Sequence, residues 1–280
     1  MRLTLLCVAL FSATSAMAAT FPTSWTAVRY TTADGGVEFL GDDDTDGQTD
    51  YREVVGNNAT PAFYVASDTT DFFFRIRLES SPLQSANNLR PFGWGILIDT
   101  DGIYSDYDYI VMINGVAGRI EYRANTTKTQ SGDPGDTAET SLANINLVWA
   151  GAGTNVRVVS AGSALGNPQA PPGTNFFLDV AIPLAVLYGT NPDGGAYLNF
   201  PPTQALGFWV GVSNSANNIQ TDLGGFLGSP GAGSLQPSVS QPVSLCSLDS
   251  QCGSVTSGSI CVTGVCTSGC RGTGGNGCPS

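Results

Sequence analysis

The chain of 280 residues contains no histidine, and this absence removes several chemistries at once. Without imidazole there is no histidine base for a serine or cysteine nucleophile, and no histidine ligand for zinc or haem. Lysine is almost as scarce, because Lys128 is the only one, and a serine–lysine dyad would depend on that single residue. We therefore expect that the protein is not an enzyme.

A hydrolase that works with carboxylates alone is the enzymatic alternative that these absences leave open. Its chemistry needs two carboxyl groups at a fixed separation across a cleft. The chain has few glutamates, and its aspartates crowd into two loops. No pair of acids in the sequence points to such a cleft.

Basic residues and long apolar runs are also in short supply. The 11 basic residues face 23 acidic ones, for a formal net charge of −12, so cations are the expected partners and nucleic acid is not. No segment approaches the roughly 18 consecutive apolar residues that a membrane helix needs, so we expect no membrane span. The short apolar run Leu3–Phe11, between Arg2 and Ala16-Met17-Ala18, predicts a signal peptide over residues 1–19 and a secreted or cell-surface protein.

Cysteine is missing from the whole middle of the chain and then becomes frequent after residue 245. The six cysteines of this tail are Cys246, Cys252, Cys261, Cys266, Cys270 and Cys278. An even number of cysteines in an exported chain predicts disulfides and leaves their connectivity open. Zinc is the alternative, but no Cys-x-x-Cys pair and no histidine accompany these thiols.

What the middle of the chain does contain is the pattern of an all-β domain. Short runs of aromatic and β-branched residues recur between Gly, Asn and Asp clusters, as in a sandwich or barrel. We expect strands at Ala62–Ala66, Phe72–Leu78, Trp94–Ile98, Tyr107–Ile113, Arg119–Arg123, Ile145–Trp149, Val156–Val159, Phe176–Ile182 and Leu206–Val212. Hairpins are predicted at Ser67–Asp71 and at Asn114-Gly115, and one helical turn at Leu184–Tyr188.

The composition divides the remaining chain into three parts. Residues 20–225 are predicted to form a β-sandwich of jelly-roll type, and the Gly-, Ser- and Pro-rich residues 226–245 a flexible linker. Residues 246–280 form the small disulfide-rich C-terminal module. Because the sequence stops directly after Cys278-Pro279-Ser280, we expect this tail to be a truncated piece of a longer module.

The first acidic loop, residues 42–53, matches the template of a calcium-binding loop. Its candidate ligands at the expected spacings are Asp42, Asp44, Asp46, Gln48, Asp50 and Glu53. Gly47 allows the sharp bend, and the glutamate at position 12 can bind in bidentate fashion. The flanking residues look extended instead of helical, so the alternative is a solvated acidic turn between strands.

A second acidic loop follows the strand at Trp94–Ile98. It offers Asp99, Asp101, Asp106 and Asp108, with Gly102 allowing the bend. These carboxylates could surround a hard cation such as calcium, and the alternative is a β-turn with aspartate at its preferred positions. Tyr104 and Tyr107 lie beside this loop, and we expect them to be exposed and to stack on a sugar ring.

Several segments of residues 35–225 together resemble bacterial extracellular domains of the DOMON-like and family 9 carbohydrate-binding type. They are Val54–Gly56, Pro61–Asp68, Phe73–Leu78, Phe92–Gly95, Asp99–Gly102 and Phe208–Asn214. The resemblance implies a β-sandwich that carries calcium on its acidic loops and binds sugar. The haem-binding branch uses axial Met and His ligands, and the absence of histidine argues against it. The tail, with its run Gly269–Cys278, resembles cysteine-rich tails on secreted and surface proteins of fruiting soil bacteria.

These inferences combine into one expectation and two alternatives. We expect a non-catalytic binding protein that is stabilised by calcium and recognises an extracellular polysaccharide or another surface ligand. The first alternative is a structural or adhesive surface protein in which calcium only stiffens the loops. The second is the carboxylate-dependent hydrolase described above.

Overall fold

The computed structural model describes most of the chain after the expected signal peptide. The described residues are 20–31, 37–39, 50–162, 165, 175–190, 196–225, 230–235, 240, 242–246, 249–252, 257–262 and 264–269. The predicted signal peptide, residues 1–19, lies outside them.

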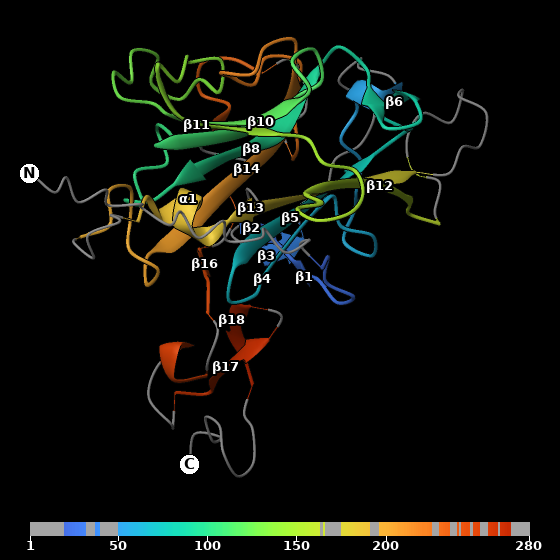
Figure 1. Cartoon of the computed structure of the whole chain (residues 1–280). Coiled ribbons are helices and arrows are strands. Elements are labelled where there is room, and N and C mark those ends of the chain that lie inside the picture. Colours follow the sequence, from blue (N-terminus) through green and yellow to red (C-terminus); the bar gives the residue numbers. More distant parts are fainter. Residues whose placement is uncertain are drawn as a thin grey trace, which may run out of the picture.

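Two antiparallel sheets stack as layers (Figure 1). The first has the order β1-β4-β5-β13-β12, with bounds Thr26–Ala27, Phe63–Ser67, Asp71–Leu78, Phe176–Pro183 and Val156–Ser160. The second has the order β11-β10-β9-β8-β14-β15, and β16 also pairs with β14. In that order, the bounds are Thr140–Asn146, Arg119–Ala124, Tyr109–Asn114, Gly93–Asp99, Ala205–Ser213 and Asp222–Leu223, and β16 is Val243–Ser244. The predicted all-β sandwich is therefore confirmed.

Short elements complete the described structure. Three small hairpins are β2–β3, β6–β7 and β17–β18, with bounds Arg29–Thr31, Val37–Phe39, Leu83–Ser85, Asn88–Leu89, Ser259–Val262 and Val265–Ser268. The helical elements are η1, α1 and η2, with bounds Asp50–Arg52, Leu184–Tyr188 and Asp249–Cys252. None of the helices in the described part of the chain reaches the length and hydropathy that crossing a bilayer requires.

Strand β5 shows how the alternating sequence builds the layers. The apolar side chains at alternate positions from Phe72 to Leu78 are fully buried in the main core between the sheets. Arg75 points to the opposite face, where its Nε lies 2.6 Å from Oδ1 of Asp179 on β13, and Arg157 of β12 holds the other oxygen of the same carboxylate at 2.6 Å. The outer face of this sheet is therefore tied across three strands by charge.

Both predicted hairpins and the predicted helical turn are present. β4 and β5 pair around the turn that contains Asp68, whose Oδ1 accepts hydrogen bonds from the backbone N–H groups of Thr70 and Asp71, each at 2.7 Å. β9 and β10 pair with Arg119 opposite Asn114, so their connection is longer than the tight two-residue turn that Asn-Gly predicts. Helix α1 has the predicted bounds.

Loops cover the outer face of the seven-stranded sheet and create a second core there (Figure 1). Leu97, Met112 and Trp209 project from this face and are fully buried under the loops. Trp209 Nε1 donates a hydrogen bond to the carbonyl of Leu235 at 2.7 Å. The acidic loop between β8 and β9 belongs to this outer layer.

The segment predicted as a flexible linker, residues 226–245, contacts the sandwich in each of its described stretches. Leu235 is fully buried in the outer core, and Ser240 Oγ accepts a hydrogen bond from the Phe208 N–H at 2.8 Å. Further on, β16 pairs with the beginning of β14, and Val243 and Leu245 join the main core. The structure thus differs from the prediction, because composition does not show that these few apolar residues have a surface to bury against.

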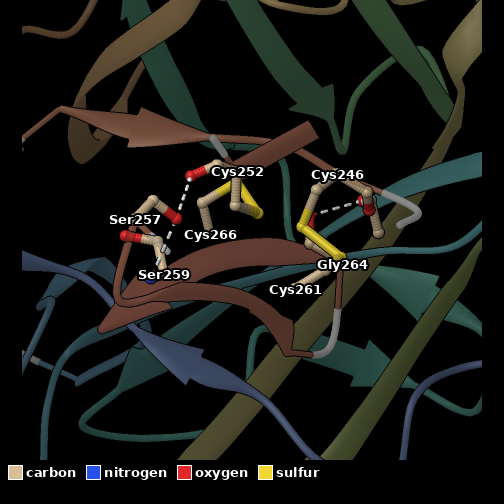
Figure 2. Close-up of a disulfide and its surroundings, with 8 residues drawn as sticks. Cys246, Cys252, Ser257, Ser259, Cys261, Gly264 and Cys266 are labelled. Atoms are coloured by element: carbon tan, nitrogen blue, oxygen red, sulfur yellow. Dashed lines mark hydrogen bonds between the residues drawn. A yellow bond between two sulfur atoms is a disulfide. The ribbon is translucent and has the colours of Figure 1, made fainter. Parts of the chain in front are cut away.

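The cysteine-rich tail contains two disulfides where it is described. Cys246 is bonded to Cys261, and Cys252 to Cys266. Figure 2 shows the two bridges next to each other on the β17–β18 hairpin. Both bridges confirm the disulfide prediction for these four cysteines, whereas Cys270 and Cys278 lie outside the described residues.

The hairpin of this tail is docked on the end of the sandwich. Gly264, between β17 and β18, has φ of +79° and lies so close to Ser67 that an added Cβ would be 2.1 Å from the Ser67 carbonyl oxygen. Ser67 Oγ donates a hydrogen bond to the Gly264 carbonyl at 2.8 Å, and Val265 enters the main core. The tail and the sandwich therefore share one core.

Candidate metal centre

The second acidic loop leaves the sheet at the end of β8 and returns to it at the start of β9. Asp99 is the last residue of β8, and the Asp108 N–H donates to the Ile98 carbonyl at 2.9 Å just before β9 begins. Gly102 has φ of +79°, a left-handed conformation that favours glycine. The turn thus folds the loop back so that its two ends lie side by side.

Three of the four predicted ligands converge. Carboxylate oxygens of Asp99, Asp101 and Asp108 all lie within 4.8 Å of one another. Asp106, the fourth predicted ligand, does not belong to this group; its Oδ1 lies 2.5 Å from Lys128 Nζ. The structure therefore supports a three-carboxylate cluster in place of the predicted four.

Asp99 is the residue of the cluster that most needs a cation. Only 2% of its surface is exposed, and its Oδ2 accepts a hydrogen bond from the Gly102 N–H at 2.9 Å. Oδ1 is buried, and no described residue donates a hydrogen bond to it. Burial, with smaller contributions from Asp108 and Asp101, raises the pKa of Asp99 to about 7, although the Gly102 hydrogen bond opposes the rise.

The other two carboxylates are oriented by the backbone. Asp101 Oδ1 accepts a hydrogen bond from the Ile103 N–H at 2.8 Å. Asp108 Oδ2 accepts two from Thr100, at 2.7 Å from N–H and 2.6 Å from Oγ1. Each carboxylate is thus oriented through one of its oxygens, and the second oxygen of Asp108 is taken by the ammonium group of Lys128. Preformed carboxylate oxygens of this kind are the ligands that calcium prefers in proteins.

Lys128 enters the cluster from the loop that follows β10. Its Nζ lies 2.6 Å from Asp108 Oδ1, 2.5 Å from Asp106 Oδ1 and 4.0 Å from Asp101 Oδ2. Burial by itself lowers the pKa of Lys128, but the hydrogen bonds to Asp106 and Asp108 outweigh it and raise the pKa above its ordinary value. The ammonium group is therefore charged and neutralises part of the cluster.

The first acidic loop lies almost entirely outside the described residues. This applies to Asp42, Asp44, Asp46, Gln48 and the side chain of Asp50. The backbone of Asp50 begins η1, and Glu53 directly after η1 is fully buried. The Glu53 carbonyl accepts a hydrogen bond from the Glu79 N–H at 3.0 Å, which fixes the end of the loop on β5.

A second buried carboxylate contacts the backbone of Val54, the residue after Glu53. Asp222 of β15 is fully buried, and its Oδ2 accepts a hydrogen bond from the Val54 N–H at 2.6 Å. Asp222 is 168 residues away from Val54 in the sequence, so no local pattern could have connected it with the loop.

The predicted sugar-stacking pair is not exposed. Tyr107 is fully buried in the outer core, where its hydroxyl donates to the Asp136 carbonyl, and burial raises its pKa above the ordinary value. Tyr104 is half-buried and packs against the same core. The prediction of an exposed pair was wrong for Tyr107, because the loops that pack over the sheet bury this side chain in the outer core.

Sequence reasoning also missed Lys128 as part of the site. The 20 residues that separate Lys128 from Asp108 give no sign in the sequence that the two side chains meet. The signal that the sequence does contain is charge: the sole lysine of an acidic chain follows the β9–β10 hairpin, whose first strand begins directly after the aspartate loop.

Fold and site together define an all-β sandwich whose outer loop layer carries a preformed cluster of carboxylates with one ammonium group beside it. No model of a known protein family, no curated protein and no solved structure shows a significant match to this chain.

Proposed function

We propose that the protein is an exported, non-catalytic binding protein that holds calcium on its acidic loops and recognises an extracellular polysaccharide or another surface ligand. The observation that carries the calcium proposal is the buried Oδ1 of Asp99, which lies in the three-carboxylate cluster without a donor among the described residues. A buried carboxylate oxygen without a partner is costly, and a divalent cation offsets that cost.

The chemistry of the cluster favours calcium over softer metals. Its candidate ligands are all carboxylate oxygens, and the cluster has no sulfur or imidazole. Hard oxygen ligands suit calcium and magnesium, and an irregular set of several carboxylates matches calcium better, because magnesium demands a near-ideal octahedron. Calcium bound by Asp99, Asp101 and Asp108 would neutralise most of the charge of the cluster and fix the loop between β8 and β9.

Export is supported by the predicted signal peptide and by the two disulfides, which are typical of oxidising compartments. The polysaccharide ligand is supported by the resemblance to carbohydrate-binding sandwiches. The burial of Tyr107 favours a second candidate, a structural or adhesive surface protein in which calcium only stiffens the loops.

Calcium binding is tested on the chain from residue 20 to 280 by calorimetric titration and by thermal unfolding with calcium or with a chelator. We expect calcium to raise the melting temperature by several degrees, because a ligand that binds only the folded state stabilises it. Asp101→Asn should lower the number of bound ions by one, since the amide keeps the hydrogen bond to Ile103 but loses the charge. Asp46→Ala tests the first loop in the same way.

Asp68→Asn is the matched control for Asp101→Asn. Asp68 also holds a turn through its Oδ1 and lies in an exposed loop, but it is outside the cluster. The calcium proposal fails if the wild-type chain binds no calcium, or if Asp101→Asn binds as many ions as Asp68→Asn does.

The two candidate functions are separated by a glycan array probed with calcium and with chelator. Glycan binding that disappears with chelator supports polysaccharide recognition. A calcium-dependent melting temperature without any bound glycan supports the structural candidate.

A further inference from the structure

Lys128 and a calcium ion would compete for the same oxygen atom. Asp108 Oδ2 is already occupied by two hydrogen bonds from Thr100, so Oδ1 is the oxygen that remains for a metal. That same Oδ1 is 2.6 Å from Lys128 Nζ. An ammonium group and a calcium ion cannot both sit at bonding distance from it on the same side, because the two cations repel each other.

The backbone around Lys128 is built to present the side chain to the cluster. Lys128 adopts φ of +50°, a conformation that costs energy for a residue with a long side chain. Its N–H donates to Asn125 Oδ1 at 3.2 Å, and the buried Asn125 in turn donates from Nδ2 to Asp136 Oδ2 at 3.1 Å. The N–H of Thr126, the residue after Asn125, donates a hydrogen bond to Glu139 Oε2 at 2.9 Å.

One ammonium group does not neutralise the site. The cluster of Asp99, Asp101 and Asp108, with Asp106 beside it, brings four carboxyl groups to one positive charge. The buried Asp99 Oδ1 is left without a donor among the described residues even with Lys128 in place. A divalent ion can therefore still gain energy from the cluster, but only by displacing the lysine from Asp108.

We infer that Lys128 is a tethered counter-cation that occupies the site in the absence of calcium and sets how much calcium is needed to displace it. This inference rests on the proposed calcium site and adds the residue that determines its affinity. In the absence of calcium, Lys128 holds the acidic loop together through Asp106 and Asp108. When calcium binds, the ammonium group moves off Asp108 and keeps its contact with Asp106. The loop is then ordered in both states, and calcium affinity is lower than three carboxylates alone would give.

The test replaces the ammonium group and measures calcium affinity by calorimetric titration of the chain from residue 20 to 280. Lys128→Gln removes the competing charge, so calcium should bind at least about tenfold more tightly, which corresponds to roughly 1.4 kcal/mol. In chelator the same variant should melt at a lower temperature than the wild type, because four carboxyl groups lose their only nearby ammonium. The two readouts move in opposite directions, which a purely structural role of Lys128 would not produce.

Arg119→Gln is the matched control for the change in net charge. Arg119 lies at the opposite end of β10, has 41% of its side chain exposed, and pairs with Glu121 instead of the cluster. It should leave calcium affinity close to that of the wild type. Lys128→Arg keeps the positive charge and should also leave the affinity close to the wild-type value.

The outcomes distinguish failure of the role of Lys128 from failure of the calcium site. Wild-type binding with equal or weaker affinity in Lys128→Gln overturns the role of Lys128 and leaves the calcium site standing. Tighter binding in both Lys128→Gln and Arg119→Gln also overturns it, because net charge would then explain the effect. Binding by neither the wild type nor Lys128→Gln overturns both proposals.

Discussion

At Asp99, binding of a proton and binding of a metal ion are coupled. This residue is buried on the sheet side of the loop, while Asp101 is partly exposed and Asp108 is shared with Lys128. In the absence of metal, burial favours the protonated form of Asp99. A calcium ion favours the ionised form of the same group, so proton and metal exclude each other at this residue.

The raised pKa of Asp99 makes calcium affinity dependent on pH. We expect affinity to be highest above pH 7 and to fall towards about tenfold per pH unit below it, because one proton must leave for each ion that binds. Calorimetric titrations between pH 5 and pH 8, at roughly unit intervals, would check this. A calcium affinity that does not change with pH over that range would show that Asp99 is not a ligand.

The raised pKa of Asp99 also makes the stability of the calcium-free protein depend on pH. The pKa of Asp99 is about 7 in the folded state and 3.8 ordinarily, so between these values the folded state holds a proton that the unfolded state has lost. Stability in chelator should therefore fall as pH rises from about 4 to about 7, and then level off. Asp99→Asn, which does not titrate, should remove that part of the pH dependence.

At the scale of elements, the β17–β18 hairpin is attached through a glycine. Gly264 combines a left-handed conformation with backbone contact to Ser67, whereas Gly118 has a similar φ of +63° and nothing within 4 Å of an added Cβ. The two positions therefore separate the cost of the conformation from the cost of the contact.

Gly264→Ala should destabilise the protein more than Gly118→Ala does. The conformational cost of a left-handed alanine is roughly 1 kcal/mol and is common to both. At position 264 the added methyl group must also push the hairpin away from β4, which adds about 1–3 kcal/mol. Unfolding in urea, followed by tryptophan fluorescence, measures both variants. Equal losses would mean that the hairpin is not docked on Ser67.

Strands in which apolar and polar side chains alternate strongly could be predicted from the sequence. Strands that form only because a neighbouring strand pairs with them could not. β5, β10 and β13 lie within a residue or two of their predicted bounds, because alternating apolar side chains mark a buried face. The strand predicted at Ile145–Trp149 overlaps only the end of β11, Thr140–Asn146, an edge strand that is mostly exposed and in which only Ala143 and Ile145 pack against the main core. The two-residue β15 and β16 exist only because β14 offers them a partner.

The acidic cluster was predictable for a similar reason, and its counter-cation was not. Asp99, Asp101 and Asp108 lie within one loop, so the sequence predicts that they are close together, but the same spacing also predicted Asp106, which contacts Lys128 instead. The positions of Lys128 and Asp222 depend on which strands are neighbours, and this is a property of the tertiary fold. The burial of Tyr107 depends on a layer of loops from three separate parts of the chain.

At the scale of the whole molecule, the sandwich and the cysteine-rich tail share one buried core. Val243, Leu245 and Val265 belong to the same buried cluster as the aromatic core between the sheets. The Cys246 N–H donates to the Gly264 carbonyl at 2.8 Å, and the disulfides hold the tail in the shape that presents Val265 to that core. Stability should therefore depend on the tail.

A chain that ends at residue 241 should be less stable than the chain that continues to residue 280. Each buried Val or Leu contributes about 1.5–3 kcal/mol, so losing three of them should cost roughly 4 kcal/mol or more. Urea unfolding of both chains under oxidising conditions gives the difference. Reducing the disulfides of the longer chain is the control, and it should cost part of the same free energy. Superimposable unfolding curves for the two chains would show that the tail is an independent module.

The pairing of β16 with β14 also has a mechanical consequence. A pulling force applied to the tail reaches the sandwich through paired strands, because Val243 and Ser244 of β16 pair with Leu206 and Ala205 of β14. Tension passes into β14, which is itself bonded along seven residues to β8 in the middle of the larger sheet. In a molecule held by its C-terminal end, the force would thus load the larger sheet, and β8, the strand that ends in Asp99, would be among the first strands to carry it.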